Sequence, residues 1–205
     1  MLMGKNLPNI LTMSRIFAVL IFVAIATIAH QGYIADKGAI LVLRCVAVVL
    51  AMLAGLTDLL DGYLARRYHW VSDFGALMDP LADKIFVTGT MLMAVEYRII
   101  PAWIAIAVLF REFMVTGLRT LAAKKQIVIS ADRWGKLKTA LQMTMLGIAG
   151  ITWAISGGTE YIRSEYWFGI RIWHIWMMFM TGIVLVTLFS GLGYFIRFRK
   201  LFSGN

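Results

Sequence analysis

The stretch TDLLDGYLARRYHWVSDFGALMDPLADK, residues 57–84, carries five of the 11 acidic residues of a chain that is 60% hydrophobic and only 15% charged. Four of these carboxylates stand at helical spacing: Asp58 and Asp61, then Asp79 and Asp83. Residues three or four apart share one face of a helix. Burying like charges without partners is costly or forces protonation. The segment therefore predicts two helices joined by a short loop, with a functional reason for their carboxylates.

Long apolar runs flank this segment, each of about 20 residues, which is the length that spans a hydrocarbon core. A soluble domain has a larger charged fraction. The pattern predicts an all-α integral membrane protein in which residues 1–205 form a single domain. Pro8 interrupts an amphipathic start, so we expect a short interfacial helix that bends there into the first span. The six expected spans are 10–29, 38–60, 75–95, 101–122, 136–156 and 169–195.

The distribution of basic residues predicts the orientation in the membrane. Six spans put both termini on one side of the membrane. Fifteen of the 20 Lys and Arg residues fall on that side and four on the other, and Arg44, inside the second span, is counted on neither side. Because cytoplasmic loops carry the excess of Lys and Arg, we expect both termini to be cytoplasmic. The net charge of +9 would suggest nucleic acid for a soluble protein. In a membrane protein, the excess of basic residues on the cytoplasmic side and their contact with anionic lipids explain this charge, and we expect no nucleic-acid partner.

The two carboxylate pairs are expected to converge just inside the cytoplasmic boundary, because a short loop makes their helices antiparallel neighbours. Oxygen ligands suit Mg²⁺ or Mn²⁺, and four carboxylates suffice for two such ions in a clamp for phosphoryl chemistry. Gly62, Ala65 and Gly75 are interleaved with the carboxylates. Small residues on membrane helices commonly serve helix packing. Among four Asp residues they favour a ligand site, because they let a ligand or backbone come close.

The complete pattern, DxxDGxxAR followed after eight residues by GxxxDxxxD, resembles the signature of the CDP-alcohol phosphotransferases. Its fixed positions are Asp58, Asp61, Gly62, Ala65, Arg66, Gly75, Asp79 and Asp83. The resemblance implies six membrane helices, a cytoplasm-facing active site and two divalent cations held by the four Asp residues. It implies transfer of a substituted phosphate from a CDP-linked lipid to an alcohol, releasing CMP, with Asp83 as general base. It associates Gly62, Ala65, Arg66 and Gly75 with the donor, CDP-diacylglycerol.

Basic residues near the cytoplasmic ends of the fourth and fifth spans point to the acceptor. Arg111 lies inside an apolar span, where a charge is costly unless it is functional or paired. A basic cluster beside a metal site suits a phosphorylated acceptor. The candidate phosphate ligands are Arg111, Arg119, Lys136 and Lys138, and the two lysines point to different faces of one helix. These stretches, with NLPNILTMSR and DPLADK, are similar to those of family members that use sn-glycerol 3-phosphate.

Three rival interpretations stay open. The same fold serves other acceptors, namely inositol phosphate or phosphatidylglycerol. A cation transporter would place carboxylates near the membrane midplane in two similar halves, and no internal repeat is seen. A non-catalytic binding subunit would be favoured by loss of a signature Asp, and none is lost. We expect a multi-pass protein of the bacterial inner membrane and, since homodimers occur in the family, a homodimer. His30, His69 and His174 receive no role.

Overall fold

A computed structural model of the chain describes residues 3–30, 34–68, 73–127, 133–157, 163–164, 166–167 and 170–198. Within these ranges, the side chains of residues 3–9, 11, 58–68, 73–77, 133, 167 and 197–198 are outside the description. The helices are α1 (Met3–His30), α2 (Lys37–Tyr68), α3 (Asp73–Glu96), α4 (Ala102–Lys124), α5 (Arg133–Ser156) and α7 (Ile172–Phe198). Two short strands, β1 (Tyr166–Trp167) and β2 (Ile170–Arg171), precede α7.

Each expected span corresponds to one of these helices, but several helices begin or end at other residues than expected. Helix α1 runs without interruption through Pro8, so the expected interfacial segment is the first part of α1 and not a separate helix. Helix α2 continues to Tyr68, so the apolar span and the first half of the acidic signature belong to one continuous helix. Helix α7 begins only at Ile172, because Tyr166 and Arg171 are paired in the antiparallel β1–β2 hairpin.

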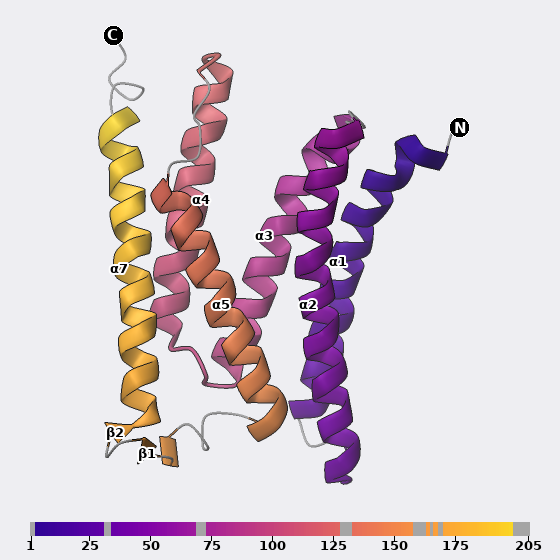
Figure 1. Ribbon diagram of the computed structural model, residues 1–205, viewed down its shortest axis with the longest axis vertical. Helices are drawn as coiled ribbons and strands as arrows, with labels where there is room; N and C mark the ends of the chain where they lie inside the picture. Colours follow the sequence, from indigo (N-terminus) through magenta and orange to yellow (C-terminus); the bar gives the residue numbers. More distant parts are fainter. Residues whose placement is uncertain are drawn as a thin grey trace. The chain divides into compact units, whose positions relative to one another are not determined.

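The chain forms two compact units, Met1–Ile99 with Ala149–Gly158, and Ile100–Ile148 with Thr159–Asn205. In the first unit, α1 packs against both α2 and α3 (Figure 1). Its buried face follows a spacing of three and four residues and includes Thr12, Arg15, Val19, Phe22 and Ala26. Gly89 of α3 allows a close approach, since a Cβ there would lie 3.1 Å from Cγ1 of Val19.

In the second unit, α4 packs against α7 (Figure 1). Val115 and Leu118 of α4 form a small buried core with Tyr194 of α7. Gly191 brings the two helices together, because a Cβ at this position would lie 3.0 Å from Cγ of Arg111. The aliphatic stem of Arg111 therefore lies directly on the backbone of α7.

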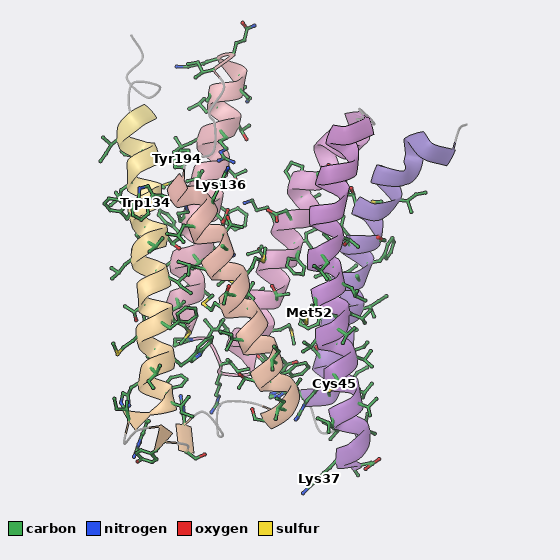
Figure 2. All side chains as sticks on the ribbon, in the orientation of Figure 1. Lys37, Cys45, Met52, Trp134, Lys136 and Tyr194 are labelled. Atoms are coloured by element: carbon green, nitrogen blue, oxygen red, sulfur yellow. The ribbon has the colours of Figure 1, made fainter. Side chains whose placement is uncertain are left out.

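The described residues include four helices long and apolar enough to cross a membrane: Thr12–His30, Lys37–Thr57, Trp134–Ser156 and Ile172–Ile196. Large apolar side chains cover their outer faces, for example Met178 at 75% exposed and Ile155 at 71%. Cys45 and Met52 also project from α2 (Figure 2). A protein in water rarely exposes so much contiguous apolar surface. The chain is an all-α membrane protein apart from the small hairpin. Helices α3 and α4, in which charged residues interrupt the apolar runs, are not among these four helices.

Candidate active site

Two helices of the first unit carry the acidic signature. Asp58, Asp61, Gly62, Ala65 and Arg66 lie along the C-terminal part of α2. Helix α3 carries Gly75, Asp79 and Asp83 near its start. The side chains of residues 58–68 and 73–77 lie outside the description, so the convergence of all four carboxylates stays a prediction.

The carboxylates of Asp79 and Asp83 are the described part of this signature. Asp79 is exposed and Asp83 is half-buried, one turn further along α3. Thr12 of α1 donates a hydrogen bond from Oγ1 to Oδ1 of Asp79 over 2.5 Å. Asp79 is thus oriented by a residue that is distant in the sequence.

The donor set fits a divalent cation of the hard type. Among the described side chains, no group of three His, Cys, Asp or Glu residues is gathered as a metal site. Two carboxylates one helical turn apart, one of them exposed, are nonetheless the oxygen ligands that Mg²⁺ and Mn²⁺ prefer. Asp58 and Asp61 would supply the remaining ligands from α2.

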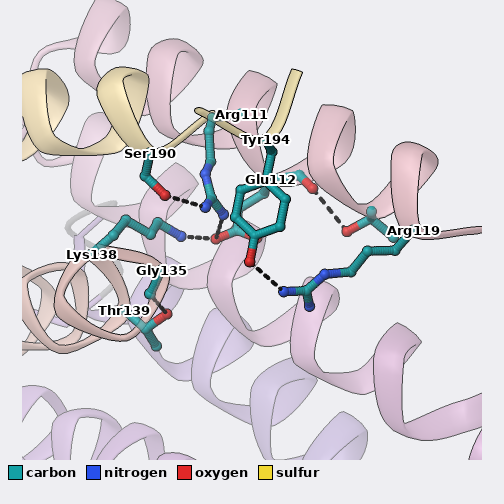
Figure 3. Close-up of polar contacts among 9 residues, drawn as sticks. Arg111, Glu112, Arg119, Gly135, Lys138, Thr139, Ser190 and Tyr194 are labelled. Carbon is teal, nitrogen blue, oxygen red and sulfur yellow. Dashed lines mark hydrogen bonds and ion pairs between the residues drawn. The ribbon is translucent and has the colours of Figure 1, made fainter. Parts of the chain in front are cut away.

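A second polar cluster lies in the other unit, between α4, α5 and α7 (Figure 3). Arg111 is 6% exposed and donates from Nη2 to Oγ of Ser190 over 2.7 Å. Its Nη1 lies 3.9 Å from Oε1 of Glu112. Lys138, only 1% exposed, forms an ion pair with the same carboxylate oxygen. Glu112 thereby offsets part of the cost of burying two cations.

Arg119 extends this cluster by two turns of α4. Its Nη2 donates to the hydroxyl of Tyr194 over 3.2 Å. The guanidinium groups of Arg111 and Arg119 lie 5.8 and 5.6 Å from the centre of the Tyr194 ring, within the range of cation–π attraction. Arg111, Arg119 and Lys138 carry three positive charges against the single carboxylate of Glu112. The described cluster therefore has excess positive charge and suits an anion.

Of the four predicted phosphate ligands, three lie in this cluster and one, Lys136, does not. Lys136 is exposed, while Lys138 is buried against Glu112. Two residues correspond to roughly 200° around a helix, so the two lysines leave α5 on different sides. Figure 2 labels Lys136 near the start of this helix.

Three contributors to the cluster were not predicted as site residues: Glu112, Ser190 and Tyr194. Glu112 directly follows Arg111, and an acid beside a base inside an apolar span could have indicated an internal ion pair. Ser190 and Tyr194 are four residues apart in a helix that is otherwise almost entirely apolar. With the buried Thr187 they form a polar stripe on one face of α7, and this stripe was the available signal.

Apolar spanning helices, a carboxylate signature on α2 and α3, and a cationic cluster on α4, α5 and α7 define an integral membrane protein equipped for phosphate-bearing substrates. The family model for CDP-alcohol phosphatidyltransferases matches residues 5–189. The chain belongs to this family.

Several curated relatives share one name, CDP-diacylglycerol–glycerol-3-phosphate 3-phosphatidyltransferase. The protein of this name from Bacillus subtilis (strain 168) is 38% identical over 140 residues, which cover 67% of this chain and 72% of the relative. The one from Rickettsia felis is 32% identical over 202 residues, covering 98% of this chain and 100% of the relative. The one from Haemophilus influenzae is 33% identical over 181 residues, covering 86% and 91%.

Proposed function

We propose that this protein transfers the phosphatidyl group of CDP-diacylglycerol to sn-glycerol 3-phosphate, giving phosphatidylglycerophosphate and CMP. The similarity to relatives of that name over nearly the whole chain supports the reaction. The observation that carries the choice of acceptor is the buried cationic cluster of Arg111 and Lys138, held in place by Glu112 and Ser190. A phosphate dianion matches its excess of positive charge.

The donor side of the reaction is assigned to the first unit. Asp58, Asp61, Asp79 and Asp83 would hold two divalent cations, either Mg²⁺ or Mn²⁺. Bound there, these ions supply neutralisation of the pyrophosphate oxygens and make CMP an acceptable leaving group. The cytidine end of CDP-diacylglycerol binds along Gly62, Ala65, Arg66 and Gly75, where small residues let the nucleotide approach the backbone.

The chemical step is an in-line displacement at phosphorus. The carboxylate of Asp83 accepts the proton from the 1-hydroxyl of glycerol 3-phosphate, and the oxygen forms a bond to the phosphorus that bears diacylglycerol. The bond from this phosphorus to the bridging oxygen breaks, and CMP leaves with that oxygen. Such transfers depend mainly on positioning and on stabilisation of charge.

The acceptor phosphate is assigned to Arg111, Arg119 and Lys138. Arg111 and Arg119 present planar guanidinium groups near the ring of Tyr194, and a guanidinium can bind two phosphate oxygens at once. Lys138 adds a point charge from α5. Lys136, which is exposed, is better explained as part of the positive cytoplasmic flank.

All six long helices are proposed to span the bacterial inner membrane, with both termini on the cytoplasmic side. Charged residues on α3 and α4 then serve the site, which explains why they interrupt the apolar runs of these two helices. CDP-diacylglycerol enters from the inner leaflet, so a cytoplasmic active site gives access to both the lipid and a soluble phosphorylated alcohol.

The decisive test is CMP release from CDP-diacylglycerol by the purified protein with a panel of acceptors. Glycerol 3-phosphate should support release, whereas glycerol should not, because it lacks the phosphate. A preference for inositol phosphate or phosphatidylglycerol would leave the mechanism intact and overturn the named product. Cation flux in liposomes without CMP release would overturn the enzymatic proposal altogether.

A further inference from the structure

Thr12 of α1 lies outside the acidic signature, yet its side chain contacts the signature directly. It is 1% exposed and donates to Asp79 across 67 positions of sequence. Several other helical threonines use their hydroxyl locally. Thr27, Thr116 and Thr144 each donate to the backbone carbonyl four residues earlier in their own helix. The contact of Thr12 with another helix therefore sets it apart from these residues.

The packing of α1 on α3 holds Thr12 at this place. Two turns further along α1, Val19 lies against Gly89 of α3, where even a Cβ would be only 3.1 Å away. Arg15 and Phe22 are buried on the same face of α1. With close contacts at two levels, α1 has little freedom to slide or rotate against α3. The Thr12 hydroxyl is thus presented to Asp79 by two closely packed helices.

The hydrogen bond has a consequence for Asp79, which is itself exposed. An exposed aspartate ordinarily samples several side-chain rotamers, and ordering it upon binding an ion costs free energy. A donor on Oδ1 fixes the carboxylate plane and leaves Oδ2 to bind a cation. Partners of this kind, which orient a metal ligand without touching the metal, typically contribute 10- to 100-fold in metal affinity or activity.

We propose that Thr12 is a positioning residue that orients Asp79 for the divalent cation. The inference rests on the proposed metal-dependent function. It assigns to the first helix a role in the site beyond spanning the membrane.

The test compares three variants by Mn²⁺ titration followed by electron paramagnetic resonance, with protein in detergent and no substrate. Thr12→Val keeps the shape and removes the donor, and should weaken Mn²⁺ binding by about 10- to 100-fold. Thr12→Ser keeps the hydroxyl and should bind within about threefold of the wild type. Thr27→Val is the matched control, because it removes the same group from the same helix, where the hydroxyl donates to the carbonyl of Val23. The affinity of this variant for Mn²⁺ should not change.

Thermal unfolding of each variant separates positioning from folding. The expected pattern is a folded Thr12→Val protein with weaker Mn²⁺ binding; if it does not fold, Thr12→Ala, which also removes the donor, takes its place. Wild-type affinity in the folded Thr12→Val or Thr12→Ala protein would overturn the role of Thr12 while leaving the metal site standing. Equal weakening in Thr27→Val would overturn it too. A wild-type protein that binds no Mn²⁺ would instead remove the proposed metal site, and this inference with it.

Discussion

Replacing Lys138 by Met, with Lys136→Met as the matched control, tests the acceptor site most sharply. Both lysines stand near the start of α5, and both changes remove one charge while keeping a long unbranched side chain. Lys138 is 1% exposed and paired with Glu112, whereas Lys136 is exposed. If the loss of positive charge near the membrane were what mattered, the two variants would behave alike.

The expected magnitude follows from the contact that is lost. A hydrogen bond to a charged group contributes about 1.5–3 kcal/mol, and about 1.4 kcal/mol corresponds to a factor of ten. Lys138→Met should therefore lower kcat/KM for glycerol 3-phosphate by about 10- to 100-fold. The KM for CDP-diacylglycerol should stay close to its wild-type value, because the cluster lies on α4, α5 and α7 and not on the signature helices. Lys136→Met should change neither constant by more than about threefold, as expected for an exposed charge.

Stability needs its own control, because Lys138→Met leaves Glu112 with a weaker set of partners. Breaking a buried ion pair typically costs about 3–5 kcal/mol, and the cost should be smaller here because Glu112 is 17% exposed and lies 3.9 Å from Arg111. Adding Glu112→Gln to Lys138→Met should recover thermal stability in detergent without restoring the acceptor constant. Recovery of both would mean that Lys138 serves folding only. Equal kinetic effects of Lys136→Met and Lys138→Met would refute the assignment.

Three further predictions concern the metal, the base and a glycine in the left-handed conformation. Chelation with excess EDTA should abolish CMP release and Mg²⁺ or Mn²⁺ should restore it; full turnover in EDTA would contradict the metal-dependent reaction. Asp83→Asn should lower kcat by about 10³-fold, since loss of a general base costs 10²- to 10⁴-fold, in a protein that remains folded; retention of more than about a tenth of the rate would exclude Asp83 as the base. Gly157→Ala should lower the free energy of unfolding by about 1–2 kcal/mol, because Gly157 has a φ of 76° and its Cβ would meet the Arg44 guanidinium. Gly147→Ala, where a Cβ meets nothing within 4 Å, is the control in thermal unfolding, and an equal effect of both changes would contradict the steric argument.

The helices of this protein could be predicted from the sequence because their cause is local. An apolar run of about 20 residues must be helical in a bilayer, where every backbone polar group needs an internal partner. The signature could be found for a similar reason, since its residues are separated by fixed helical spacings along 26 positions. Arg111 was identified because a charge inside an apolar run is costly without a function or a partner.

Contacts between helices could not be predicted in this way. Spacing showed that Lys136 and Lys138 point to different faces, but only the packing of α5 decided that Lys138 meets Glu112. The hydrogen bond from Thr12 to Asp79 likewise depends on the register of α1 against α3. The hydrogen bond from Arg111 to Ser190 depends on the register of α4 against α7. Apolar faces tolerate many registers, because lipid and neighbouring helices are similarly apolar. The sequence by itself therefore determined which helices form and where a charge inside an apolar run needs a partner or a function. The close approach of helices at Gly89 and Gly191 decided which side chains meet.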